Sequence, residues 1–240
     1  MKLKKDKFLT NEQTISYYDE IADNYDNILE QRDSNKIIRQ KVAAKFQDIV
    51  KGGLILDFGG GTGLDLDWLL DKGYRVIFCE PSAGMREKAI KHIRNGLPSP
   101  SIIFLDDGKV DFTGWQAELP FFHKVDSILA NFAVINNIAE IKLLFKALAL
   151  VMKPGAHLIA LILNDGFRKS VKLRWIGNLR SLIFGTPFSF YIQHKGNRQS
   201  VFIYTIKEIQ KASREEFHFC SQELMPQSEF SLIHLVRKMN

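Results

Sequence analysis

Cysteine is scarce in this sequence, with only Cys79 and Cys220 among 240 residues. Two cysteines exclude the disulfide framework that holds small secreted domains together, and we expect both to be small buried apolar side chains. We also expect no secretory leader, because the basic start at residues 2–7 is not followed by the apolar core of a signal peptide. These absences predict a cytoplasmic protein.

No long hydrophobic run is uninterrupted. Residues 143–163 are apolar over a length that could span a bilayer, but Lys146 and the Lys-Pro-Gly turn at 153–155 divide them into a helix, a turn and a strand. The sequence therefore predicts no transmembrane span. With 45% hydrophobic and 11% aromatic residues, the chain has enough apolar side chains for one sizeable core, which predicts a single domain over residues 1–240.

The most informative segment is a strand followed by a glycine-rich turn. The hydrophobic strand expected at 54–58 leads directly into the turn at 59–63, where a backbone without side chains can touch a ligand. A helix expected at 64–72 follows, and its first amides can donate hydrogen bonds to a carboxylate or phosphate. The next strand, 75–79, ends at Glu80, an acid about 20 positions after the turn that is placed to accept hydrogen bonds from a ribose diol. The segment predicts a nucleoside-containing cofactor.

Helices and strands are expected to alternate along most of the chain. Helical patterns at 14–27 and 34–50 precede the first strand. The elements expected after it are helix 64–72, strand 75–79, helix 83–94, strands 102–105 and 125–130, helix 138–151, and strands 157–163, 217–222 and 230–237. A capping box at Thr205 and Glu208 opens a further helix before the last two strands. Strands separated by helices predict a parallel sheet covered on both faces.

The glycine turn has the pattern Asp57-x-Gly59-x-Gly61-x-Gly63, and Leu64 stands where a dinucleotide fingerprint needs a third small residue. This pattern resembles the first motif of class I S-adenosylmethionine (SAM) methyltransferases. Four more blocks resemble that family in its chain order: Glu80-Pro81-Ser82-Ala83-Gly84-Met85, Asp106-Asp107-Gly108, a strand from Val125 to Ala130 ending at Asn131-Phe132, and Met152-Lys153-Pro154-Gly155. The resemblance spans roughly residues 14–164. Residues 17–26 also resemble the lead-in helix of small-molecule methyltransferases of the type-11 group.

The resemblance implies a Rossmann-like, doubly wound α/β fold. Its sheet would be mostly parallel and seven-stranded, with the last strand antiparallel. Residues 1–53 would form an N-terminal helical cap over the cofactor. Residues 165–199 would be an inserted helical lid or substrate segment, placed between the fifth strand and the capping box.

The resemblance also implies that the chain binds SAM and releases S-adenosylhomocysteine. Asp57 would lie near the ammonium group of SAM, and Glu80 would bind both ribose hydroxyls. Asn131 and Phe132 would lie near the methionyl part and the transferable methyl group. The backbone amides that would approach the methionyl part belong to the turn residues Gly59, Gly61 and Gly63.

The adenine and the cover of the cofactor are assigned in the same way. Pro81 and Met85 resemble the residues that pack beside the adenine. Its exocyclic amine would donate to Asp107 or to Asp106, because the register of that loop is open by one residue. Tyr25 and Tyr18 could close over the cofactor, where an aromatic face favours the sulfonium cation, or they could be ordinary packing residues. These last assignments rest on the lead-in pattern of Tyr17 to Asp26.

Methyl transfer from a sulfonium depends mainly on positioning, since a near-attack geometry contributes on the order of 7–11 kcal/mol. The sequence has no serine, cysteine or histidine triad pattern. A base is still needed where a hydroxyl must lose its proton, and the candidates are His194 first and His123 second, although each could instead be structural. No group of residues has metal-ligand spacing, so no metal is expected.

Residues 165–199 are expected to decide the substrate. Their first half, 167–184, has an amphipathic helical pattern with basic residues around an apolar face, and their second half is aromatic. A lid over a small apolar or aromatic acceptor, contact with a membrane surface, and plain packing on the domain all remain open. The expected reaction is in-line methyl transfer to an oxygen, nitrogen or carbon atom of that small molecule.

Three alternatives compete with this interpretation. The net charge of +6 suggests an RNA or other nucleic-acid methyltransferase, but the basic residues are dispersed. Asn131 is also followed by Phe132-Ala133-Val134, unlike the Pro-Pro-aromatic run of amino-directed nucleic-acid methyltransferases. A SAM-binding partner subunit without activity would keep the same cofactor motifs. A dehydrogenase is disfavoured by Leu64 and by a chain too short for a usual second substrate domain.

Overall fold

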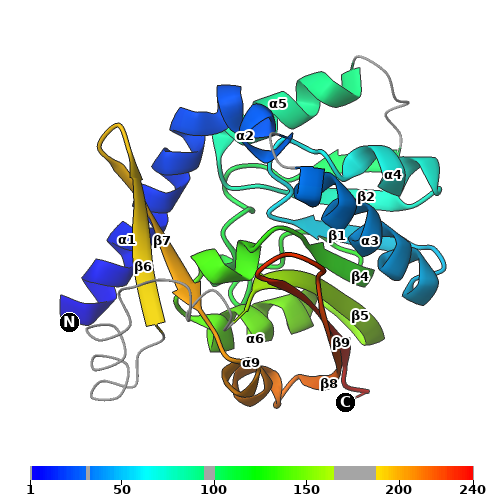
Figure 1. The fold of residues 1–240 in the computed structure, drawn as a ribbon. Coiled ribbons are helices and arrows are strands. Elements are labelled where there is room, and N and C mark those ends of the chain that lie inside the picture. Colours follow the sequence, from blue (N-terminus) through cyan, green and yellow to red (C-terminus); the bar gives the residue numbers. More distant parts are fainter. Residues whose placement is uncertain (1, 31–32, 95–100, 165–187, 240) are drawn as a thin grey trace.

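The computed structural model describes residues 2–30, 33–94, 101–164 and 188–239. Its centre is a seven-stranded sheet with the order β3-β2-β1-β4-β5-β9-β8 (Figure 1). The strands of this sheet are β1 Leu54–Phe58, β2 Arg75–Cys79, β3 Ile102–Phe104, β4 Val125–Ala130, β5 Met152–Leu163, β8 Phe217–Leu224 and β9 Phe230–Arg237. Neighbouring strands from β3 to β5 are parallel, whereas β9 is antiparallel to both β5 and β8. The predicted doubly wound sheet with an antiparallel last strand is therefore confirmed.

The strand order reverses at β1. From this strand the chain proceeds to β2 and β3 on one side, and then returns to place β4 and β5 on the other. Both β2 and β4 pair with β1 in parallel, so the carboxyl ends of all three strands lie at one edge of the sheet. Doubly wound proteins bind ligands outside the carboxyl ends of the strands at such a switch point. The loops after β1, β2 and β4 are thus the expected place for a site.

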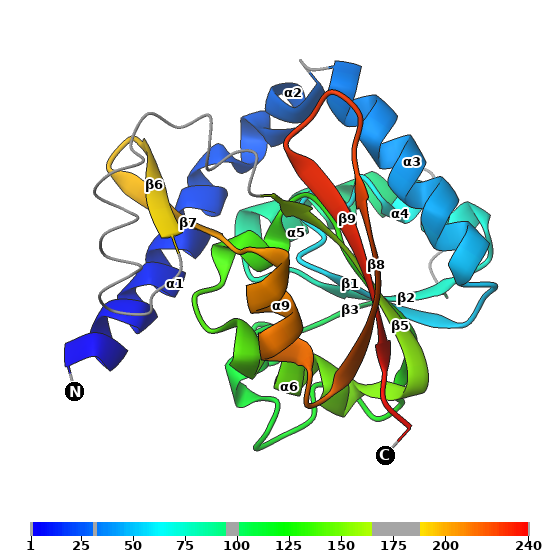
Figure 2. The same cartoon turned by 60° about the horizontal axis from the view of Figure 1, so that its bottom comes forward.

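Helices cover both faces of the sheet. The described helices are α1 Lys2–Ile21, η1 Ala22–Asn24, α2 Tyr25–Glu30, α3 Asp33–Ile49, α4 Leu66–Asp71, α5 Ala83–Arg94, η3 Phe112–Gly114, η4 Val134–Asn137, α6 Ile141–Val151 and α9 Ile206–Ser213. The helices α3 and α4 lie on one face, and α6 and α9 lie on the other (Figure 2). None of the described helices is long and apolar enough to cross a membrane.

The sheet separates two apolar clusters. Adjacent residues of a strand point to opposite faces, so Ile55 and Leu56 of β1 belong to different clusters. Both are fully buried and every residue of β1 is buried, which explains why this parallel strand is hydrophobic on both faces except at Asp57. On one face, Phe46 of α3 packs into the cluster of Ile55, and on the other, Phe145 of α6 packs into that of Leu56. The helix α3 is therefore part of the core.

A separate two-stranded hairpin stands beside α1. Its strands are β6 Phe188–His194 and β7 Asn197–Ile203, and both views place it along α1 (Figures 1 and 2). Alternate residues of β7, beginning with Gln199, are buried, so one face of the hairpin turns toward the domain. The described part of segment 165–199 is thus a strand pair, where a helical lid was expected. The helix predicted at 167–184, with its lid or membrane-surface role, lies outside the described residues.

Some expected boundaries differ from the structure. The helix α4 begins at Leu66, not at residue 64, because the turn continues through two backbone hydrogen bonds, from the Gly63 amide to the Gly60 carbonyl and from the Leu66 amide to the Gly63 carbonyl. Cys79 is buried as expected, but Cys220 is exposed, since it lies at a register shift in β8. The predicted capping box at the start of α9 is confirmed.

Candidate functional site

A cavity of about 920 Å³ opens at the carboxyl ends of β1, β2 and β4. The loops after these strands form one side of it, and residues of α1 and α2 form another. Most of the predicted cofactor residues line this cavity: Asp57, Gly59, Gly61, Glu80, Pro81, Met85, Asp107, Asn131, Phe132, Tyr25 and Tyr18. Gly63 and Asp106 do not line it. The strand order explains why residues so far apart in the sequence meet here.

The turn after β1 is held by its own backbone. The amide of Gly59 donates to the Cys79 carbonyl (2.7 Å), and that of Gly61 donates to Glu80 Oε2 (2.9 Å). The amides expected to approach a ligand therefore have acceptors within the protein. The glycines instead keep the turn narrow, because a Cβ at Gly59 would lie 2.5 Å from Val134 Cγ1. With φ at +72°, Gly59 also has a backbone conformation that side chains disfavour.

Glu80 presents a buried carboxylate at the end of β2. Its Oε1 accepts from the Ser82 amide (2.8 Å) and its Oε2 accepts from the Gly61 amide, so the carboxylate joins the loops after β1 and β2. Burial raises the pKa of Glu80 to about 7, although the two amide donors act in the opposite direction. The group is therefore poised to change its protonation when a hydrogen-bond donor enters the cavity.

Asp57, at position four of β1, is the least compensated charge of the site. Its side chain is 1% exposed, and its Oδ2 atom has no hydrogen-bond partner among the described residues. Burial, reinforced by the neighbouring carboxylate of Asp65, raises the pKa of Asp57. A buried acceptor without a donor is rare in folded proteins, so this oxygen marks a place for a donor or cation from a ligand.

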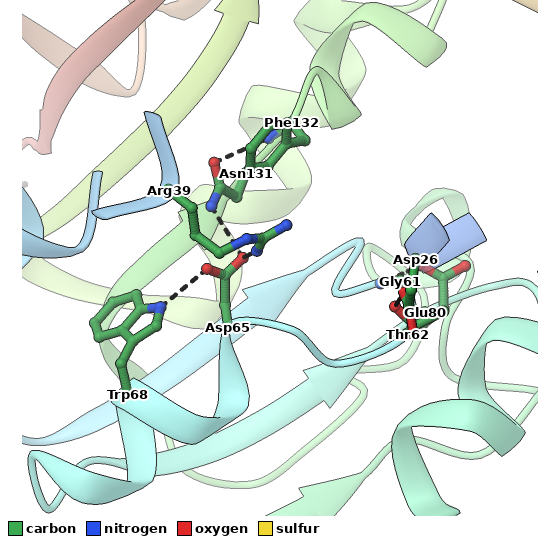
Figure 3. Close-up of polar contacts among 9 residues, drawn as sticks. All are labelled: Asp26, Arg39, Gly61, Thr62, Asp65, Trp68, Glu80, Asn131 and Phe132. Atoms are coloured by element: carbon green, nitrogen blue, oxygen red, sulfur yellow. Dashed lines mark hydrogen bonds and ion pairs between the residues drawn. The ribbon is translucent and has the colours of Figure 1, made fainter. Parts of the chain in front are cut away.

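Asp65 lies at the centre of a hydrogen-bond network on the other side of the turn. Figure 3 shows Arg39, Trp68 and Asn131 converging on its carboxylate. Arg39 Nη1 donates at 2.5 Å, and Trp68 Nε1 and Asn131 Nδ2 each donate at 2.9 Å. The guanidinium of Arg39 also lies 4.5 Å from the centre of the Phe132 ring. Asp65 thus fixes Arg39, which lines the cavity and has further donors to offer.

The chain turns sharply after β4. Phe132 and Ala133 both have positive φ, at 50° and 65°, which is uncommon for residues other than glycine. The turn is held by the Ala133 amide, which donates to the Leu161 carbonyl (2.8 Å), and by Asn131 Oδ1, which accepts from the Phe132 amide (3.0 Å). Such strained backbone concentrates at functional sites, and here it brings Asn131 and Phe132, which follow β4, to the cavity wall.

The N-terminal helices are tied to the cofactor loops by two carboxylates. Asp26 of α2 accepts from the Thr62 hydroxyl (2.5 Å), as Figure 3 shows. Asp19 of α1 accepts from the Ser82 hydroxyl (2.6 Å) and from the Gly84 amide (3.0 Å). Between these anchors the Tyr25 ring lies over the glycine turn, 3.7 Å from the position of a Cβ at Gly61. Tyr25 therefore lies beside the glycine turn, and its role as a cover over the cofactor stays a prediction.

Pro81 and the buried Met85, which follow β2, also line the cavity. Of the two candidate acids beyond β3, only Asp107 lines the cavity. Its side chain is 85% exposed and forms an ion pair with Arg86. Asp107 is the better placed of the two, and Arg86 keeps it at the rim.

Neither histidine proposed as a base lies at the cavity. His123 belongs to a small cavity lined by Leu54, Arg75, Lys124 and Lys153, at the amino ends of the strands. The length of β1, about 13 Å, separates that edge from the site. His194 ends β6 at the exposed tip of the hairpin, next to Glu20. The geometry therefore does not support either histidine as a base at this cavity, because sequence spacing does not show at which edge of the fold a loop histidine lies.

Several residues of the site were not predicted. Arg39 belongs to the helix expected at 34–50, and Asp65 to the helix expected at 64–72, and neither pattern assigns them a role at a site. Asp19 and Asp26 lie within the lead-in pattern, which predicts a role for its tyrosines. A signal was present in that both acids directly follow a tyrosine, in Tyr18-Asp19 and Tyr25-Asp26. Their anchoring role became visible only once the loops they bind were placed.

Comparisons with known proteins agree with this geometry. A family model described as a methyltransferase domain matches residues 28–199. A curated relative, an uncharacterized methyltransferase of Geobacillus sp. strain WCH70, is 36% identical over 81 residues. That match covers 31% of this chain and 37% of the relative, so it spans well under half of the relative's length.

Solved structures share the fold at low sequence identity. The DhpI–SAH complex is 15% identical, with a TM-score of 0.66 and coverage of 96% of this chain and 98% of that one. The 1,6-didemethyltoxoflavin-N1-methyltransferase of Burkholderia thailandensis is 10% identical, with a TM-score of 0.67 and coverage of 97% and 90%. A SAM-dependent methyltransferase from Clostridium acetobutylicum is 16% identical, with a TM-score of 0.62 and coverage of 92% and 99%. At these identities the likeness shows the fold.

The packing under the turn predicts the effect of one added methyl group. A Cβ at Gly60 would lie 2.7 Å from Asp57 Oδ2 and 2.8 Å from Phe78 Cζ, so Gly60→Ala forces buried groups apart. We expect the free energy of unfolding, measured by urea denaturation, to fall by about 1–3 kcal/mol. The matched control is Gly114→Ala, where no atom lies within 4 Å of the added Cβ. Equal stability of the two variants would contradict this description of the turn.

Proposed function

This chain belongs to the methyltransferase domain family, and from that premise we propose that it transfers the methyl group of SAM to a small-molecule acceptor. The observation that carries the proposal is the pairing of Glu80 and Asp57 in one cavity. Glu80 is a buried carboxylate held at the end of β2, and Asp57 has a buried oxygen without a donor. A nucleoside with a cationic amino-acid tail satisfies both.

Each polar part of SAM has a suitable partner in the cavity. The two oxygens of Glu80 accept the ribose hydroxyls, as such an acid does in dinucleotide-binding folds. Asp57 attracts the ammonium group, directly or through water. Arg39, fixed by Asp65, offers donors to the carboxylate at the same end. Pro81 and Met85 border the adenine, and Asp107 at the rim accepts from its amine.

The chemistry asked of the protein is mainly positioning. Bound SAM supplies a methyl group that is already activated by its attachment to a sulfonium. The turn at Asn131 and Phe132 holds the wall beside that group, and Tyr25 covers it from the side of α2. Excluding water and holding the acceptor in line can supply most of the rate enhancement.

The acceptor is a small, largely apolar or aromatic molecule. At about 920 Å³, the cavity is near the upper end of the range for ligand sites, which leaves room beside a cofactor for a second molecule. Its walls beyond the cofactor residues include Ile15, Val134, Ile138 and Leu143. One structural neighbour, the enzyme from Burkholderia thailandensis, has a small heterocycle bound together with S-adenosylhomocysteine, which supports the same division of the cavity here.

The proposal is tested by calorimetric titration of the whole chain with SAM, S-adenosylhomocysteine and NAD. We expect both adenosyl ligands to bind and NAD not to bind, because the cavity offers a partner for the methionyl ammonium and Leu64 replaces the small residue of a dinucleotide fingerprint. Binding of NAD alone would overturn the proposal.

Glu80 predicts how cofactor affinity depends on pH. Ribose hydroxyls stabilise the ionised carboxylate, so the pKa of about 7 in the free protein falls in the complex, and binding below pH 7 must release a proton. The affinity for S-adenosylhomocysteine should therefore fall as pH drops below 7, by up to about tenfold per pH unit from this group. Calorimetry between pH 5.5 and 8 measures it.

The variant Glu80→Gln removes this titration and leaves that of Asp57. We expect the wild type to lose more affinity than Glu80→Gln between pH 7 and 6, and the variant to bind more weakly at pH 8. Glu87→Gln, an exposed position on α5, is the matched control and should follow the wild type. Parallel pH profiles for wild type and Glu80→Gln would remove Glu80 from the ribose site.

Arg39 is tested with two ligands that differ in their amino-acid tail. Arg39→Met keeps an apolar stem but loses the charge-assisted hydrogen bonds, so affinity for S-adenosylhomocysteine should fall about 10- to 100-fold. Affinity for 5′-methylthioadenosine, which lacks the amino-acid group, should stay within about twofold of wild type. Lys41→Met, exposed on the same helix, is the control. An equal loss for both ligands would mean that Arg39 supports the fold and does not bind the tail.

A further inference from the structure

Three polar side chains from separate elements meet at the wall of the cavity formed by α1. The Tyr18 hydroxyl of α1 accepts from Asn137 Nδ2 of η4 (3.0 Å) and from Gln199 Nε2 of β7 (2.6 Å). Gln199 Nε2 also donates to Asn137 Oδ1 (2.8 Å). Tyr18 and Asn137 line the cavity, and Gln199 is 8% exposed behind them. The cluster joins the N-terminal helix, the loop after β4 and the inserted hairpin.

The arrangement leaves one hydrogen-bonding group unused. A tyrosine hydroxyl can accept through its oxygen and donate one proton. The two amides occupy the oxygen, and among the side chains that the structure describes none accepts the proton. Burial raises the pKa of Tyr18 well above its ordinary value, so the hydroxyl keeps its proton. Tyr18 is thus a neutral donor next to the cavity, and it is not a base.

A second unused hydroxyl lies one helical turn away. Thr14 precedes Tyr18 by four residues, which places both on the same face of α1. Thr14 lines the cavity, is 8% exposed, and its Oγ1 has no hydrogen-bond partner among the described residues. The lining also includes the apolar residues Ile15, Ile138 and Leu143 and the carboxylates Glu12 and Glu140. This part of the cavity thus combines apolar surface with the two hydroxyls of α1.

The base available for deprotonation is weak. All six histidines lie in the described part of the chain, and none lines the cavity. The described lining also contains no cysteine and no lysine, and its ionisable acceptors are carboxylates, of which Glu12 is at the exposed rim. A carboxylate or water removes a proton most readily from an acceptor whose own proton is acidic. Conjugation of an O–H or N–H with a carbonyl group provides that acidity.

We propose that the acceptor is a flat molecule whose methylated O–H or N–H is conjugated with a carbonyl group, and that the Tyr18 hydroxyl donates a hydrogen bond to that carbonyl oxygen. This inference rests on the proposed methyl transfer and names its substrate class. The acceptor loses its proton to water, and the electron pair stays on the heteroatom, shared through the conjugated system with the carbonyl oxygen. The Tyr18 hydrogen bond stabilises the charge that develops there.

Two probes of the same ring size test the inference without any variant. The first is 2-hydroxy-1,4-naphthoquinone, which has the conjugated carbonyl group, and the second is 2-naphthol, which lacks it. Calorimetry measures the binding of each probe to the wild-type protein saturated with S-adenosylhomocysteine. We expect the quinone to bind at least about tenfold more tightly, as a charge-assisted hydrogen bond in a buried site provides. Equal affinities would overturn the proposed class.

Tyr18→Phe then tests the residue. It keeps the ring and removes the hydroxyl, so the preference for the quinone should fall to about threefold or less, while 2-naphthol binding stays near that of wild type. Tyr17→Phe is the matched control, because Tyr17 carries the same hydroxyl on the preceding residue and does not line the cavity. An unchanged preference in Tyr18→Phe would remove Tyr18 from the acceptor site even if the wild-type preference is present.

The titration with S-adenosylhomocysteine separates this inference from the proposed function. Tyr18→Phe keeps the aromatic ring that was expected to face the cofactor, so it should bind S-adenosylhomocysteine within about twofold of wild type, which also shows that the variant is folded. Failure of the wild type to bind that ligand would overturn the methyl-transfer proposal itself. Normal binding of it, together with no preference between the probes, would overturn only the acceptor class.

Discussion

The cleft depends on how three buried carboxylates at one edge of a parallel sheet are compensated. Asp57, Asp65 and Glu80 are 1%, 5% and 7% exposed. A buried charge without donors is costly, so the surrounding structure must supply hydrogen bonds or let the group keep its proton. Asp65 receives three side-chain donors, Glu80 receives two amides, and Asp57 retains an oxygen without a donor. Asp65 is thus compensated within the protein, whereas Asp57 is left with an oxygen that can accept a hydrogen bond from a ligand.

Hydrogen bonds to carboxylates also connect the N-terminal helices to the site. Asp19 and Asp26 satisfy groups of the loops after β2 and β1, so the cover over the cavity is specified by hydrogen bonds rather than by a large apolar contact. The apolar cluster beneath it is small, with Ile21, Ala22 and Met85 as its buried members. These hydrogen bonds hold the N-terminal helices in a defined place, while few buried apolar contacts would have to break for the helices to move away.

The sequence predicted the features that depend on neighbouring residues and missed those that depend on contacts between distant ones. The strand at 54–58, the glycine turn and Glu80 are local patterns, and the structure places them together as expected. Arg39 is bound to Asp65 across 26 positions, and Tyr18 to Gln199 across 181, and no local pattern encodes either contact. His194 and His123 lie away from the cavity for the same reason, since residue type suggested chemistry and only topology decides where a residue lies. The roles of the cofactor residues toward SAM remain predictions.

Tyr18 and Asp19 are consecutive residues, yet they face different partners. Asp19 is bound to the loop after β2, whereas Tyr18 is bound to Asn137 after β4 and to Gln199 of the hairpin. One helix therefore borders both halves of the cavity, and a motion that frees one half disturbs the other. The loops after β2 and β4 are therefore coupled through a single dipeptide, because a displacement of α1 that breaks the hydrogen bonds of Asp19 also strains those of Tyr18.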